Sequence, residues 1–230
     1  MYSSPPPPFD TQAAYSNPPG CLRRFLIPVL AVLITSSFLV FGLNKIEIVQ
    51  AESPALSAIE QPELQSGISS VFTPEVQFWK EEILIWSETY QLDPNLVATV
   101  MQIESCGFIL AESGAGAKGL FQVMPYHFRE GENPYHPNIN AKRGLQYLRQ
   151  AKESGGNSRL ALAGYNGGLN GASLPEEEWP EEMTRYVYWG LKIYKDAKNG
   201  LDHSARLQEW LNAGGASLCQ KASESQRKTQ

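Results

Sequence analysis

Three short stretches of the 230-residue chain place reactive side chains among apolar neighbours. Glu104-Ser105 follows the apolar run 95–103, Gln122 lies within Gly-Leu-Phe-Gln-Val-Met-Pro, and Tyr165-Asn166 precedes two glycines. Each has an ordinary structural explanation when taken singly. A Glu at a helix end is commonly solvated, a Gln in an apolar segment commonly bonds backbone, and Tyr-Asn-Gly-Gly is typical of a helix C-terminus. Their significance depends on the elements that position them.

Glu104 is expected to face inward from the end of a helix. The Asp-Pro pair at 93–94 is a typical helix start, and the spacing predicts a helix from there to about Glu104. Three- and four-residue steps place Val100, Met101 and Glu104 on or beside one apolar face. Burial there disfavours the charged carboxylate and raises its pKa, so Glu104 stays protonated near neutrality and can act as a general acid.

Further helices are expected around this one, because strand-like alternation is nearly absent. The pattern beginning at Thr73-Pro74 repeats apolar residues at helical spacing as far as Tyr90. Residues 107–118 should form a loop, and 119–125 either a turn of helix or an irregular segment. Additional helices are predicted over 140–151, 159–165, 181–197 and 205–211.

The three stretches, followed by a Tyr on a later helix, resemble the motifs of the soluble lytic transglycosylase (SLT) family. That family carries Glu-Ser, Gly-Leu-(Met/Phe)-Gln-x-x-Pro and Ala-x-Tyr-Asn-x-Gly in this order, and the likeness covers about residues 74–200. The resemblance implies an all-α dominated, lysozyme-like catalytic domain. Cys106 after Glu-Ser and Gly164 before Tyr-Asn depart from the commoner residues, but both are small.

The resemblance also implies roles for individual residues. Glu104 would be the catalytic acid/base, Ser105 would help to orient substrate or carboxylate, and Tyr186, with Tyr188 as the competing choice, would bond the Glu104 carboxyl. Phe121, Tyr126, Tyr165 and Trp189 are candidates for stacking on sugar rings. The substrate-binding set is Ser105, Gly119, Leu120, Gln122, Met124, Tyr165, Asn166 and Tyr186.

A second carboxylate is hard to find, although most glycosidases place one about 5–10 Å from the acid. Glu112 lies in a Gly/Ala loop, and Glu130 and Glu132 lie in a polar segment. The family resemblance implies a mechanism with one Glu that cleaves the MurNAc-GlcNAc β-1,4 bond of peptidoglycan. The C6 hydroxyl of the sugar is the nucleophile, the product is 1,6-anhydro-MurNAc, and no cofactor is needed.

Two other functions remain open from the sequence. A goose-lysozyme-like muramidase would use the same fold but hydrolyse the bond with water. A non-catalytic peptidoglycan-binding module of the envelope would only bind glycan strands, and it would have no need for an apolar-faced Glu104 combined with Gln122 and Tyr186.

The N-terminal part predicts a membrane anchor. Residues 25–43 carry no charge and would span about 28 Å as a helix, close to the hydrocarbon core of a bilayer. Arg23 and Arg24 place the preceding residues in the cytosol and the catalytic domain outside it. Cleavage of a signal peptide near Ala51, giving a secreted protein, is the alternative. The predicted organisation is a disordered cytosolic tail (1–24), anchor (25–43), flexible linker (44–73), catalytic domain (74–217) and disordered C-terminal tail (218–230).

Composition narrows the partners. The net charge of -5 argues against nucleic-acid binding, which needs a basic face. The expected partners are peptidoglycan glycan strands and, through residues 25–43, a membrane, with the protein as a monomer. The three histidines are scattered and no Cys/His cluster has zinc-ligand spacing, so no metal is expected. Cys106 and Cys219 would share an oxidising compartment, where pairing and separate thiols both remain open.

Overall fold

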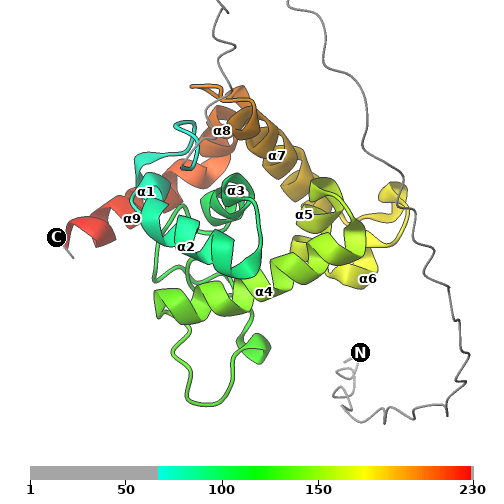
Figure 1. Cartoon of the computed structure of the whole chain (residues 1–230), viewed down its shortest axis with the longest axis horizontal. Coiled ribbons are helices and arrows are strands. Elements are labelled where there is room, and N and C mark those ends of the chain that lie inside the picture. The colour runs from blue at the N-terminus through cyan, green and yellow to red at the C-terminus, as the bar shows by residue number, and fades with distance from the viewer. Residues whose placement is uncertain (1–66, 229–230) are drawn as a thin grey trace, which may run out of the picture. The chain divides into compact units, whose positions relative to one another are not determined.

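The computed structural model describes residues 67–228, and this part of the chain consists of helices with isolated β-bridges and no strands. The all-α prediction is therefore confirmed for these residues. The elements, shown in Figure 1, are α1 (Pro74–Gln77), α2 (Lys80–Tyr90), α3 (Pro94–Glu104), the 3-10 turn η1 (Pro125–His127), α4 (Pro137–Gly155), α5 (Ser158–Gly167), α6 (Leu169–Ala172), η2 (Glu176–Glu178), α7 (Glu181–Lys198), α8 (Ala205–Trp210), the π-type turn η3 (Leu211–Gly215) and α9 (Ala216–Arg227).

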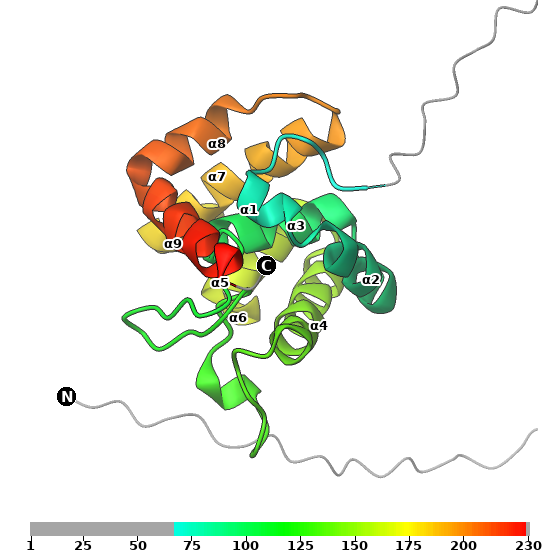
Figure 2. The same ribbon diagram turned by 90° about the vertical axis from the view of Figure 1, so that its left-hand side faces the viewer.

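Helix α3 is the central element, and α1, α2 and α7 pack against it. Every residue from Asn95 to Gln102 is buried, so α3 has no solvent-exposed stripe along most of its length. It begins as predicted, with Pro94 at the first position and the Asp93 carboxylate accepting from the Asn95 N–H at 2.9 Å. Figures 1 and 2 show α3 between α2 and α7, and it contacts both.

The predicted helices are present, but the first is divided in two. The single helix expected from Thr73 to Tyr90 is interrupted at Trp79, whose backbone (φ -94°, ψ 12°) leaves the helical region. This break lets the Trp79 indole donate to the Gly107 carbonyl at 3.0 Å and stack on Trp86. The interruption therefore ties the N-terminal helices to the end of α3.

The folded domain begins earlier than predicted. Residues 44–73 are predicted to be a linker, but Ile68, Val71 and Phe72 are buried in the main hydrophobic core. Segment 44–73 is polar overall, so its composition does not indicate that these three apolar residues at its end are buried. The boundary at residue 74 is therefore wrong, and the fold includes residues from at least 68 onwards.

The predicted disordered tail over 218–230 is also wrong for most of its length, because α9 spans Ala216–Arg227. A kink at Gly214 (φ 125°) turns the chain from α8 into α9. Cys219 and Ala222 are buried, and Cys219 forms a disulfide with Cys106, just beyond the end of α3. Polar residues predominate in this helix, so no apolar stripe marks it in the sequence. Its packing depends instead on two small buried residues, the disulfide and side-chain hydrogen bonds to Glu75.

The predicted anchor at 25–43 lies outside the described residues, as do the tail 1–24 and most of the predicted linker. Among the helices of residues 67–228, none has the length and apolar character needed to cross a bilayer.

We predict that the disulfide contributes strongly to stability, because it closes a loop with a sequence separation of 113. Chain-entropy arguments give close to 5 kcal/mol for such a loop, and typical measured values are about 2–4 kcal/mol. The Cys106→Ser/Cys219→Ser double variant should melt about 5–15 °C lower in thermal unfolding followed by circular dichroism. Added reductant should lower the melting temperature of the unmutated protein and leave that of the double variant unchanged. Equal melting temperatures without reductant would contradict the prediction.

Candidate active site

Glu104 lies at the C-terminal end of α3, in the wall shared by two adjoining pockets of about 480 and 470 Å³. Both volumes are in the range of ordinary ligand sites. Glu104, Ser113 and Gln122 line both pockets. The two pockets therefore form one cleft, and the Glu104 carboxyl lies where they adjoin. The α4 pocket is further lined by Met124, Tyr126, His127, Arg143, Tyr147, Tyr165, Asn166 and Glu182, among others. The α9 pocket is further lined by Phe108, Leu110, Ala111, Glu112, Leu218 and Lys221.

A larger hollow of about 910 Å³ lies between the N-terminal segment and α9, and it shares no lining residue with this cleft. Strongly displaced pKa values are typical of functional sites, and Glu104, which carries such a displacement, lies in the cleft. Size alone therefore does not identify the site, and the chemistry favours the cleft.

Burial raises the pKa of Glu104 to about 8 from an ordinary value of 4.5. The hydroxyl of Tyr186 acts in the opposite direction and lowers this pKa, and the nearby negative charge of Glu182 raises it. Glu104 also stands at the negative end of the α3 dipole, where a carboxylate is disfavoured. The side chain is therefore a protonated acid at neutral pH that still borders open space.

Tyr186, on α7, faces Glu104 from within the core. Its hydroxyl is buried and forms no hydrogen bond of normal geometry among the described residues, although it interacts with the Glu104 carboxyl. The pKa of Tyr186 is raised well above its ordinary value by burial and by Glu104, so the hydroxyl keeps its proton. An unpaired buried donor beside Glu104 can stabilise a carboxylate when one forms. Tyr188, the alternative, is exposed and bonds Glu209 instead.

Aromatic rings line the α4 pocket in sequence. Tyr126, His127, Tyr147 and Tyr165 make successive ring contacts, with centroids 4.5, 5.1 and 6.0 Å apart. Tyr165 also donates its hydroxyl to the Phe121 carbonyl at 2.6 Å, and burial followed by the charge of Glu104 raises its pKa. These rings offer apolar surface of the kind that packs against a sugar ring. Two of the four stacking candidates, Phe121 and Trp189, line neither pocket.

Several predicted substrate contacts are instead internal supports of the cleft. Ser105 is fully buried, donates its hydroxyl to the Leu120 carbonyl at 2.7 Å and accepts from the Gly107 N–H at 3.1 Å. Leu120 is fully buried in the core. Ser105 and Leu120 therefore couple the end of α3 to the loop that carries Gln122, and neither lines a pocket.

Asn140 fixes the same loop from α4, and no sequence motif marks it. Its side-chain amide donates to the carbonyls of Lys118 and Pro134 at 2.7 and 2.8 Å, and its oxygen accepts from the Phe121 N–H at 2.8 Å. Gly119 lies against this amide, and a Cβ there would approach the Asn140 nitrogen to 2.4 Å, with a φ of +74°. Gly119 is thus required by close packing, which explains its place in the motif without contact to a ligand.

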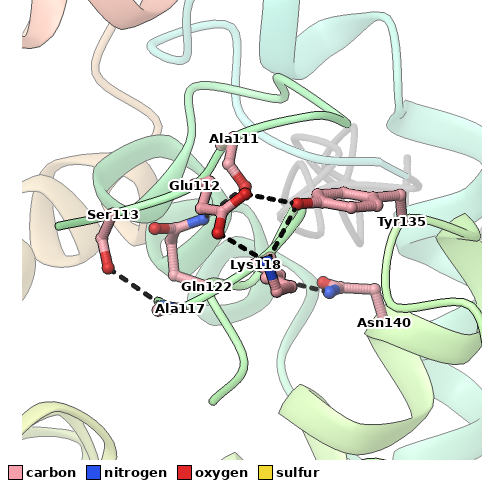
Figure 3. Close-up of polar contacts among 8 residues, drawn as sticks. All are labelled: Ala111, Glu112, Ser113, Ala117, Lys118, Gln122, Tyr135 and Asn140. Atoms are coloured by element: carbon pink, nitrogen blue, oxygen red, sulfur yellow. Dashed lines mark hydrogen bonds and ion pairs between the residues drawn. The ribbon is translucent and has the colours of Figure 1, made fainter. Parts of the chain in front are cut away.

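Gln122 is the predicted residue most central to the cleft. Its backbone has a positive φ of 45°, and its side chain donates to the carbonyls of Ala111 and Gly119 at 3.2 and 3.0 Å. Figure 3 shows this side chain beside the Ala111–Ser113 strip of the same loop. The loop is closed on itself by backbone bonds between Lys118 and Val123. Met124 and Asn166, also predicted, line the α4 pocket with it.

Two of the three carboxylates first considered as partners of Glu104 are engaged elsewhere. Glu112 bonds Lys118 at 2.6 Å and the Tyr135 hydroxyl at 2.7 Å (Figure 3), and both contacts lower its pKa. Arg143 binds Glu132 through two nitrogens and lowers the pKa of that carboxyl to about 2. The missed residue is Glu182, an exposed carboxylate at the start of α7 that lines the α4 pocket. No apolar spacing or motif singles it out.

One group of metal-ligating residue types occurs within residues 67–228, formed by Glu75, Cys106 and Cys219. The two sulfurs are bonded to each other and so do not act as thiolate ligands. The expectation that the protein uses no metal and no cofactor stays a prediction.

Comparison with known proteins shows what part of this chain is similar to. Residues 81–178 match the family model of the transglycosylase SLT domain. A transglycosylase of Enterobacteria phage PRD1 is 41% identical over 97 residues, which are 41% of this chain and 37% of the phage protein. The chain thus spans little more than a third of that relative. A structure of an inactive mutant of the lytic transglycosylase Slt from Pseudomonas aeruginosa aligns with a TM-score of 0.43 and 22% identity, covering 53% of this chain and 24% of that one.

We predict that the Glu104 carboxyl titrates near pH 8 in carbon-13 NMR of side-chain-labelled protein. Tyr186→Phe should raise this pKa, because it removes the group that favours the carboxylate, and Glu182→Gln should lower it by removing a negative charge. Because the folded-state pKa is above the unfolded value, unfolding free energy should fall as pH rises from about 5 to 8. Glu104→Gln should abolish that part of the fall. A titration midpoint near 4.5 would contradict the assignment.

Proposed function

We propose, because residues 81–178 match the family model of the transglycosylase SLT domain, that the protein is a peptidoglycan lytic transglycosylase. Its substrate would be the β-1,4 bond between MurNAc and GlcNAc. The observation that carries this proposal is the Glu104 carboxyl, with a pKa of about 8, in the wall shared by the two pockets. A glycan strand lying along the cleft would place a glycosidic oxygen next to a protonated acid, as cleavage requires.

The chemistry begins with transfer of the Glu104 proton to the glycosidic oxygen that leaves. The bond between that oxygen and the MurNAc C1 breaks, and Glu104 becomes a carboxylate. The buried Tyr186 hydroxyl, which already favours the charged form of Glu104, stabilises it at this stage. Glu104 then takes the proton of the C6 hydroxyl as its oxygen bonds to C1. The product is a 1,6-anhydro-MurNAc end, and Glu104 is protonated again.

The other carboxylates considered as bases support a mechanism in which Glu104 is the single acid/base. Glu112 pairs with Lys118 and Glu132 pairs with Arg143, and their lowered pKa values make both carboxylates weak bases. Glu182 is the remaining carboxylate of the α4 pocket. It acts on the pKa of Glu104, which explains its position without a direct chemical role. Because Glu182 could instead activate a water molecule, it is the residue that separates transglycosylation from the hydrolytic, muramidase alternative.

The catalytic domain is proposed to work outside the cytosol, as a monomer attached to the membrane by residues 25–43. The Cys106–Cys219 disulfide supports export, because such bonds persist in oxidising compartments. Release of the domain by cleavage near Ala51 would give the same compartment without attachment.

We predict that Glu104→Gln lowers the rate of peptidoglycan cleavage by about 10²- to 10⁴-fold, the usual contribution of a positioned acid/base. Glu182→Gln is the matched control and should retain most of the activity. Mass spectrometry of the muropeptides released by the unmutated protein should show 1,6-anhydro ends.

Other outcomes identify the competing functions. Reducing muropeptide ends, together with loss of activity in Glu182→Gln, would show a muramidase that uses water. Binding to peptidoglycan without cleavage by the unmutated protein would show a non-catalytic module.

A further inference from the structure

The α9 pocket is half of the cleft, and one wall of it comes from outside the segment that matches the SLT domain. Leu218 and Lys221, on α9, line this pocket together with Phe108 and Leu110, whereas the family match ends at residue 178. Residues 218 and 221 are three positions apart and so lie on one side of the helix. This side of α9 is directed at the space next to Glu104.

Helix α9 is held in place by bonds to the N-terminal helices and to the end of α3. Besides the disulfide from Cys219 to Cys106, Ser223 donates to the Glu75 carboxylate at 2.5 Å. Gln226 donates to the Glu75 carbonyl at 2.9 Å. Figure 2 shows α9 lying next to α1. These contacts fix both the position and the rotation of α9, so Lys221 is presented to the pocket by a rigid helix.

The charges of the α9 pocket leave one cation without a partner. Glu112 is neutralised by Lys118, which also bonds Tyr135 (Figure 3). Glu104 is protonated at neutral pH because its pKa is about 8. Within the described part of the chain, the Lys221 ammonium forms no hydrogen bond or ion pair. The pocket therefore combines apolar surface from Phe108, Leu110 and Leu218 with a single uncompensated positive charge.

We propose that the α9 pocket binds the peptide substituent of the glycan strand, with Lys221 pairing with a peptide carboxylate. This proposal rests on the proposed function. Peptidoglycan strands carry short peptides on their muramyl groups, and these peptides combine small apolar side chains with free carboxylates. The carboxylate of such a peptide would neutralise the positive charge of Lys221, and its small apolar side chains would pack against the apolar surface of the pocket. A bare sugar, which has no charge, would not use Lys221.

The test measures the affinity of the protein for glycan fragments, which does not depend on cleavage of the glycan. Glu104→Gln protein would be titrated by calorimetry with peptide-bearing glycan fragments and with the same fragments after enzymatic removal of the peptides. Adding Lys221→Ala should weaken binding of the peptide-bearing fragments by about 2- to 5-fold, as expected for a solvent-exposed ion pair. Lys221→Glu should weaken it further, and both effects should shrink at high salt. Binding of the peptide-free fragments should not change.

Lys228→Ala is the matched control, because Lys228 is an exposed lysine at the end of the same helix and lines neither pocket. It should bind both kinds of fragment as the Glu104→Gln protein does. Equal affinity of Lys221→Ala and its parent for peptide-bearing fragments would overturn the proposal, and so would an equal loss for both kinds of fragment. The identity of the products, measured on unmutated protein, decides the proposed function separately.

Discussion

The cost of placing a charge at Glu104 is the constraint on which the rest of the site depends. Helix α3 is buried on all sides from Asn95 to Gln102. Its last turn, which carries Glu104, therefore directly continues a fully buried segment. Burial removes water from the Glu104 carboxyl, and the carboxyl also lies at the negative end of the α3 dipole. Both favour the protonated form, and the Tyr186 hydroxyl limits the penalty when the proton leaves. An acid that must give up and recover one proton needs this balance.

The segment after Glu104 converts a buried helix end into one side of an open cleft. Cys106 and Gly107 both have positive φ and turn the chain sharply, while Ser105 bonds back to the Leu120 carbonyl. A Cβ at residue 107 would approach the Glu75 carbonyl to 2.6 Å, so glycine is required there. The disulfide at Cys106 then draws α9 to the same place. The position next to the acid thus organises the loop, the helix and the second pocket.

The sequence is informative where apolar spacing or a motif marks a residue, as for α3, Glu104, Gln122, Tyr165 and Tyr186. It is less informative about role, because the motifs mix residues that line the cleft with residues that hold its loop. Ser105, Gly119 and Leu120 belong to the second kind, and only their contacts reveal it. Asn140, Glu182 and Lys221 look like ordinary polar positions on helices. Their importance arises from tertiary contacts over long sequence separations, which a local pattern does not encode.

The central claim is that a protonated Glu104 delivers the proton that breaks the glycosidic bond. The pH dependence of kcat/KM on purified peptidoglycan tests it most directly, since the alkaline limb reports the pKa of the essential acid in the free enzyme. The account predicts that activity falls as pH rises through about 8. It also predicts that Tyr186→Phe moves this limb to higher pH. An alkaline limb between pH 4 and 5, or one that Tyr186→Phe does not move, would contradict the claim.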